Sequence, residues 1–198
     1  VWTMTLAGQD VDCVCIAAHT AGSSGSTLQM RIDGDLVATI TPTDNSPIMA
    51  IFRETQADEF SLTITGAVCE IGAIRVGKMI ALPQMIYGGV SPLDLSPTVE
   101  TRTNQSEQGQ FLGRYTTVRN LSGNFEWTDV QTDWTRDYWQ PFEQSSRNEP
   151  FFVAWRPDPY ARSAQDVAFV TSAQFNPPQH QGGNTRDTLS FSATAWNW

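Results

Sequence analysis

The feature that most constrains the fold of this chain is its alternation of apolar and polar residues. Leu28, Met30 and Ile32 alternate with polar residues, and the dipeptide Asp33-Gly34 follows before the alternation resumes. A period of two is typical of strands with one buried face, and Asp-Gly is a preferred two-residue hairpin turn. The segment therefore predicts two antiparallel strands joined at Asp33-Gly34.

Strand signals recur along the whole chain. EFSLTIT and TLSFSATAW alternate in the same way, whereas DVDCVCIAAHT is nearly continuously apolar and should be buried on both faces. Further strands are expected within CEIGAIRVGKMIAL, GQFLGRYTTVRN, NFEWTDV, PFFVAWRP and DVAFVTSAQF. Short strands separated by Gly, Pro, Ser and Asn are typical of sandwiches and jelly rolls. We predict a mostly β chain, with an N-terminal jelly roll or β-sandwich followed by a β-rich domain with one short α-helix.

The sequence changes character after residue 79. ALPQMIYGGVSPLDLSP combines three prolines with a glycine pair, a composition that favours an extended connector. We therefore predict a galactose-binding-like jelly-roll domain over 1–79, a connector over 80–100 and a β-rich domain over 101–198.

One segment has the spacing of a helix. Within TDWTRDYWQPFEQSSRN, Trp134, Tyr138 and Phe142 recur every four residues, which places them on one helical face. A helix is expected near 132–146, with Thr132 or Asp133 as its N-cap. Because proline removes a backbone donor, Pro141 should kink the helix or end it early.

The charge composition narrows the classes of partner. The chain has 198 residues, a formal net charge of −9 and a pI near 4.5, so a phosphate backbone would be repelled and nucleic acid is excluded as a partner. No stretch is apolar enough to span a membrane as a helix. Lys78 is the only lysine and the other eleven basic residues are arginines. Arginine suits fixed, bidentate contacts, which favours a chain that makes protein–protein contacts.

The cysteines and histidines do not suggest a metal or a disulfide framework. Cys13, Cys15 and Cys69 are too few for a disulfide scaffold and are expected to be buried thiols in a reducing compartment. Only His19 and His180 could join them as metal ligands. The acidic turns at 10–12 and 33–35 do not match a calcium-binding EF-hand loop. No metal and no cofactor are expected.

Motifs of known catalytic machinery are missing from the sequence. It contains no GxSxG, GxxxxGK[ST], HExxH or CxxC. His19 precedes Ser23 and Ser24, but a histidine that ends a buried strand and bonds to nearby backbone explains it more simply. Carboxylates that a glycosidase could use by type alone are Glu107, Glu126 and Glu143. We expect no enzymatic activity.

Sugar binding remains an alternative. Seven tryptophans could supply stacking surfaces, and Trp196 and Trp198 at the chain end are the candidates with the greatest expected exposure. Trp134, Trp139 and Trp155 are more simply core or interface residues. In this alternative the chain is a carbohydrate-binding module that adsorbs to host cell-surface glycans through the loop at 22–25.

Several segments, in order, resemble those of a known group of proteins. DCVCIAAHTAGSSGSTLQMRIDGD resembles the start of a jelly-roll domain in tailed-bacteriophage virion proteins, and IGAIRVGKMIALPQMIYGG is similar to their exit strand and connector. NQSEQGQFLGR and PFFVAWRPDPY resemble the second half of the same proteins, and between them lies the aromatic helix ending in Pro141-Phe142.

The resemblance implies a structural component of a phage tail, tail tip or baseplate ring, similar in role to distal-tail proteins. It implies other tail proteins and copies of the chain itself, in a ring or trimer, as partners. The expected location is the virion, after assembly in the host cytoplasm. The resemblance carries no catalytic residues.

The charged segment between two apolar strands is interpreted through this resemblance. Arg156, Asp158, Arg162 and Asp166 lie in the connection of FFVAWRPDPYARSAQDVAFV, where prolines fix the backbone. Two arginines and two aspartates balance in charge and supply no nucleophile. We interpret the segment as a corner that also serves as a candidate subunit contact, together with Arg114 in QSEQGQFLGR.

Overall fold

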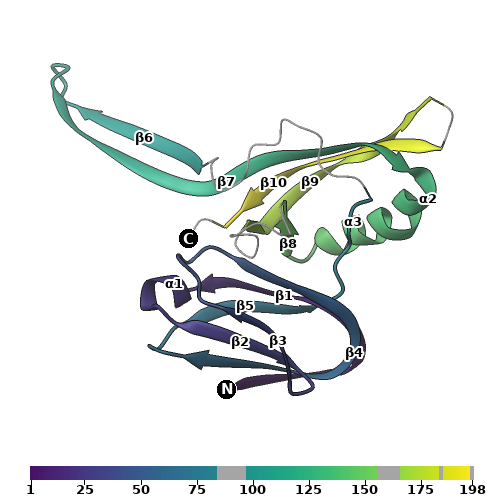
Figure 1. The fold of residues 1–198 in the computed structure, drawn as a ribbon. Coiled ribbons are helices and arrows are strands. Elements are labelled where there is room, and N and C mark those ends of the chain that lie inside the picture. The colour runs from purple at the N-terminus through teal and green to yellow at the C-terminus, as the bar shows by residue number, and fades with distance from the viewer. Residues whose placement is uncertain (84–96, 156–165, 183–184, 197–198) are drawn as a thin grey trace. The chain divides into compact units, whose positions relative to one another are not determined.

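The computed structural model describes residues 1–83, 97–155, 166–182 and 185–196. The chain divides into compact units, which are described separately. Val1–Leu82 and Phe152–Phe169 lie in the first, and Pro83–Phe151 and Val170–Asn197 lie in the second. The described residues form two five-stranded sheets (Figure 1).

The first sheet has the strand order β3-β2-β4-β1-β5, and all its pairings are antiparallel. Two of its strands are long, and they pair with each other over most of their length. The strands are β1 (Trp2–His19), β2 (Thr27–Ile32), β3 (Asp35–Ile40), β4 (Ile48–Thr65) and β5 (Ile71–Gly77), with a short helix α1 (Ala21–Ser24) after β1.

Strand β1 changes direction at a bulge. The β1–β4 register shifts between Thr5 and Gln9, where Ala7 and Gly8 have φ angles of +54° and +74°. A bulge bends a strand and increases its twist. Because of this bend, side chains from both ends of β1, such as Leu6 and Ile16, share one hydrophobic core with Phe60 of β4. The unit is therefore β-sandwich-like although its strands form one continuous sheet (Figure 1).

Two local predictions in this unit are confirmed. Strands β2 and β3 form the expected hairpin, and Asp33 and Gly34 have φ angles of +47° and +87°. Positive φ at both central residues is the requirement of a type I′ turn. The segment from Val11 to Ala17 is buried at every position, as expected for a strand covered on both faces.

The second sheet has the strand order β6-β7-β10-β9-β8. Its pairings β6–β7, β7–β10 and β10–β9 are antiparallel. Its strands are β6 (Pro97–Gln105), β7 (Phe111–Gln131), β8 (Phe151–Ala154), β9 (Val167–Gln181) and β10 (Arg186–Ala195). The two strands expected within GQFLGRYTTVRN and NFEWTDV are one continuous strand of 21 residues, β7. Strand β6 begins within the segment that the sequence assigns to the connector.

A continuous helical segment follows β7, as predicted near 132–146. It consists of α2 (Thr132–Trp134), a π-helical turn η2 (Thr135–Trp139) and α3 (Gln140–Ser146). Of the two outcomes expected at Pro141, an early end is excluded, because the helix continues to Ser146, and the kink stays a prediction. Pro141 lies in the first turn of α3, directly after the π-helical turn, where the wider winding accommodates a missing backbone donor. Gln131 is the N-cap residue, without a side-chain cap bond, so the expected caps at Thr132 or Asp133 are also wrong.

The buried face of the helix differs from the expected stripe. Trp139 is 2% exposed, whereas Tyr138 is 53% exposed and stacks on Trp134. The Trp139 indole packs against three aromatic rings on the sheet, with ring centroids 5.7–6.0 Å apart. These rings belong to Trp127, Phe175 and Phe191. Because Trp139 fills this aromatic core, the adjacent Tyr138 side chain faces solvent.

The mostly β fold with one short helix is thus confirmed, while the jelly-roll and galactose-binding-like assignments and the domain ranges stay predictions. Over the described ranges, no helix has the length and apolar character needed to cross a membrane.

Candidate interaction surface

Strands β6 and β7 form a two-stranded arm at one edge of the second sheet. We define the arm as residues 97–121, over which β7 pairs with β6. From Leu121 to Gln131, β7 pairs instead with β10. The arm therefore continues past the end of β10, which is visible where β6 and the first half of β7 extend away from β9 and β10 (Figure 1).

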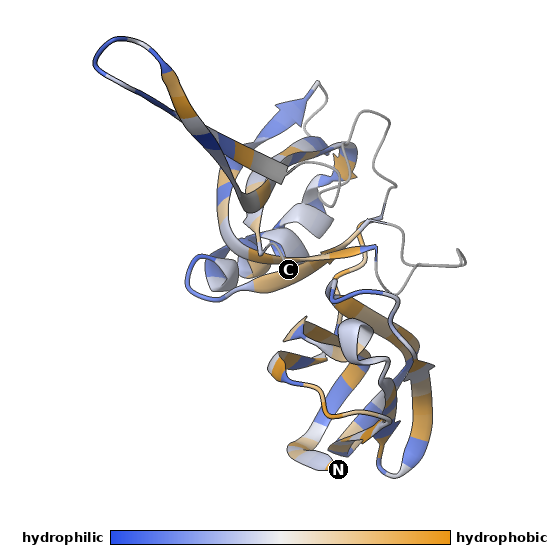
Figure 2. Cartoon of the chain, turned by 90° about the vertical axis from the view of Figure 1, so that its left-hand side faces the viewer, coloured by the Kyte–Doolittle hydropathy of each residue, from blue (hydrophilic) through white to orange (hydrophobic). Residues whose placement is uncertain are grey.

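The arm exposes large apolar side chains. Val99 is 53% exposed, Phe111 and Leu112 are each 66% exposed, and Tyr115 is 57% exposed. Figure 2 shows apolar bands within the arm and a hydrophilic tip. An isolated two-stranded ribbon is only marginally stable in water, since neither face is covered. Exposed apolar groups on such a ribbon indicate a surface that another molecule covers.

One edge of β7 is open within the arm. In the sheet order, β7 lies between β6 and β10, but β10 reaches only as far as Leu121. Over 111–117, no strand among the described residues pairs with the β7 edge that faces away from β6. An open edge presents unpaired backbone N–H and C=O groups that can accept an additional strand.

The arm is locally well formed. At its tip, the Ser106 N–H donates to the Gln110 carbonyl and the Gly109 N–H donates to the Ser106 carbonyl, both at 2.9 Å. Gly109 has a φ angle of +78°, which glycine adopts without strain. An ion pair at 2.7 Å joins Arg102 to Glu100 along β6. These bonds fix the hairpin before any partner binds, which lowers the entropy lost on binding.

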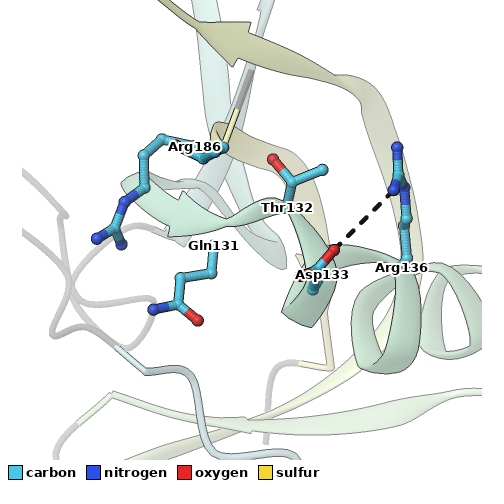
Figure 3. A pocket seen from close by; sticks show the side chains of 6 residues that line it. Gln131, Thr132, Asp133, Arg136 and Arg186 are labelled. Atoms are coloured by element: carbon cyan, nitrogen blue, oxygen red, sulfur yellow. Dashed lines mark ion pairs between the residues drawn. The ribbon is translucent and has the colours of Figure 1, made fainter. Parts of the chain in front are cut away.

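A separate polar pocket of about 230 Å³ lies where β7 meets the helix. Figure 3 shows Gln131, Thr132 and Asp133 between Arg186 on one side and Arg136 on the other. Each arginine has an acidic neighbour, Arg136 at 4.0 Å from Asp133 and Arg186 at 3.5 Å from Asp129. Thr132 lines the pocket, and its hydroxyl is buried without a hydrogen-bond partner. The pocket thus has paired charges and no group poised for chemistry.

The predicted corner residues are only partly described. Arg156, Asp158 and Arg162 lie outside the described residues. Asp166 is described, and its backbone carbonyl accepts a hydrogen bond from the Trp155 N–H at 3.2 Å. Arg114 lies on the arm, in the middle of the open β7 edge, and is exposed. The structure therefore does not bring Arg114 into a described cluster with the corner, and the subunit-contact role of these residues stays a prediction.

His19 is held by backbone groups. Its Nε2 donates to the Ser46 carbonyl at 2.7 Å, and its Nδ1 accepts from the Ala21 N–H at 3.3 Å. Burial lowers the pKa of His19, although the Ser46 carbonyl and the Asp44 carboxylate act in the opposite direction. The ring is thus neutral with both nitrogens engaged, which leaves no free nitrogen to activate a serine.

The loop proposed for sugar binding uses its polar groups internally. The Ser23 N–H donates to Asn45 Oδ1 at 3.0 Å, and the Ser23 hydroxyl donates to the Thr20 carbonyl at 3.0 Å. The Ser24 and Ser26 hydroxyls lie 2.7 Å apart. The bond to Asn45 attaches the loop to the segment before β4, and the other bonds are local to the loop.

The cysteines are free thiols. Cys13 and Cys15 are buried and Cys69 is half-buried. A side-chain contact with Cys13 and burial raise the pKa of Cys15, which makes it a poor nucleophile. Over the described part of the chain, no group of three His, Cys, Asp or Glu side chains is arranged to hold a metal.

Comparisons of the chain with protein-family models, with curated proteins and with solved structures gave no match. The candidate surface therefore rests on the geometry of the arm. The sequence singles out Arg114 and predicts a strand over Phe111, Leu112 and Tyr115, but it does not predict β6. Residues 97–105 contain only one large apolar residue, Val99, so they show no apolar face.

Proposed function

We propose that this chain is a structural component of a bacteriophage tail, in the tail tip or a baseplate ring, which connects tail parts through protein–protein contacts. The observation that supports this best is the arm, a preformed β-hairpin with an open edge and exposed apolar side chains. In a monomer the apolar side chains and the open edge of this ribbon stay uncovered, whereas in an assembly a neighbouring molecule can cover them.

Two further observations agree with this proposal. The segments that resemble tailed-phage virion proteins include the arm itself, in NQSEQGQFLGR. The catalytic candidate raised by the sequence, His19, is bonded on both ring nitrogens, which favours a non-enzymatic role. The proposed partners are other tail proteins and further copies of this chain.

The direct test is to look for the chain in particles. A tagged copy would be produced during infection by the phage that encodes it, and purified virions would be analysed by mass spectrometry and by labelling of the tag in electron micrographs. We expect a fixed number of copies per particle, with label at the tail. Recovery of the chain only from the particle-free fraction would overturn the proposal.

The sugar-binding alternative is tested on the same purified chain. A glycan array would detect binding to cell-surface polysaccharide, and deletion of residues 22–25 should abolish it if the loop forms the site. Glycan binding together with absence from virions would favour the alternative.

A further inference from the structure

We infer that the open edge of β7 over residues 111–117 is a β-augmentation site for a strand of a second copy of this chain. The contact is heterologous, because the arm of one copy pairs with a different surface of the next. This inference rests on the proposed function, in which the arm connects tail parts, and it names a second copy of the chain as the partner of the arm.

The backbone groups of β7 favour an added strand at this edge. Strand β7 is paired with β6 alone over 111–121 and with β10 alone from Leu121 to Gln131, so within the arm the edge that faces away from β6 is open. An incoming strand would lie in line with β10 and continue the sheet along β7. Gly113 has open space around its missing Cβ, so a neighbouring strand can approach closely there.

The apolar side chains beside this edge also favour an added strand. Leu112 and Tyr115 flank Gly113 and are each more than half exposed. Aromatic and aliphatic side chains beside a strand contribute cross-strand pairs once a neighbour is added. A docked strand therefore gains both main-chain hydrogen bonds and side-chain burial at the same place.

The charge distribution favours a copy of the chain as the partner. The arm carries three arginines and two glutamates, whereas the rest of the chain carries 9 basic and 19 acidic residues. The arm thus has a formal net charge of +1, whereas the rest of the chain is strongly acidic. Opposite charge favours contact between an arm and the body of another copy, and like charge disfavours contact between two arms.

The heterologous geometry has a consequence for the assembly. Contacts between two different surfaces propagate from copy to copy and close into a ring when the rotation permits. This matches the ring that the proposed function requires, without an additional contact surface.

The test uses the full chain and matched variants. The arm variant Leu112→Ser/Tyr115→Ser removes one aliphatic and one tyrosine side chain, and the control Val68→Ser/Tyr138→Ser removes the same types from exposed positions outside the arm. A second arm variant, Thr116→Lys, adds a charge to the open edge. Circular dichroism and thermal melts would verify that each variant is folded.

Light scattering after size exclusion gives the mass of the oligomer. Amide hydrogen exchange shows whether the backbone N–H groups of β7 over 111–117 become protected. We expect the wild type and the control to form an oligomer in which exchange over 111–117 slows as concentration rises. Both arm variants should be monomers. Mixing wild type with the arm variant should give mixed species, because the variant still offers its body to a wild-type arm.

Several results would overturn the inference. A wild type that stays monomeric at high concentration would exclude the second copy as partner, while detection of the chain in virions would still support the proposed function. An oligomer that persists in both arm variants, or unchanged exchange over 111–117, would also contradict it. Failure of the variant to enter mixed species would contradict the heterologous arrangement.

Discussion

The carboxylate of Asp33 accepts a hydrogen bond from the backbone N–H of Glu59 at 2.8 Å. The same carboxylate accepts from the Asp58 N–H at 3.0 Å, so the turn between β2 and β3 is tied to the middle of β4. We expect Asp33→Ala to reduce the free energy of unfolding by about 2 kcal/mol, because two backbone donors lose their partner and the αL position loses a tolerant residue. Urea denaturation measures this, with Asp35→Ala, an exposed neighbour, as the control.

Gly22 is required by a close approach of two backbone segments. A Cβ at this position would overlap the backbone of Asp44, which cannot yield as a flexible side chain does. Gly22→Ala should lower the free energy of unfolding by about 3 kcal/mol through overpacking. Gly77→Ala is the matched control, since its Cβ would meet nothing within 4 Å. Equal stability of the two variants in urea would show that the loop does not pack on Asp44.

His19 makes stability depend on pH in a defined direction. Its pKa in the folded state is lowered mainly by burial, so the unfolded chain binds a proton more readily. The stabilising contribution is present above the unfolded pKa of about 6.5 and is lost as the pH falls below it. We expect the urea midpoint to drop from pH 7.5 to pH 5.5, and to drop less in His19→Gln. The same pH dependence in both proteins would contradict this account.

Trp139 and Tyr138 are adjacent residues with opposite environments. Trp139→Ala should lower the free energy of unfolding by about 4 kcal/mol, because it leaves a cavity among the rings of Trp127, Phe175 and Phe191. Tyr138→Ala should lower the free energy of unfolding by about 1 kcal/mol, since only the stacking of the tyrosine ring on Trp134 is lost. Thermal unfolding of both variants gives the comparison. A larger loss for Tyr138→Ala would mean that the sequence-predicted helical face is the buried one.

Local signals in the sequence were sufficient to predict several secondary-structure elements. Asp33-Gly34 predicts its hairpin because the turn geometry depends on two residues alone. The buried segment of β1 and the helix over 132–146 follow from their own apolar spacing. Their positions required no knowledge of distant partners.

Other features depend on long-range pairing and could not be predicted locally. The bulge at Ala7 arises from the register of β1 against β4, about 50 residues away in sequence. The helix turns Trp139 inward because three distant strand residues leave space for an indole. The sequence predicts the β7 half of the arm, within GQFLGRYTTVRN, but not β6, because residues 97–105 contain only one large apolar residue, Val99. Arg114 was identified through a resemblance, and its position on the open edge comes from the structure.

The central claim is that the arm joins this chain to the tail. The most direct measurement is the amount of tagged chain in purified virions when the wild type, Leu112→Ser/Tyr115→Ser or Val68→Ser/Tyr138→Ser is produced during infection. We predict that the wild type and the control are incorporated to the same level, and that the folded arm variant is lost from particles by at least about tenfold, which corresponds to 1.4 kcal/mol of contact free energy. Incorporation of the arm variant at the wild-type level would contradict the account.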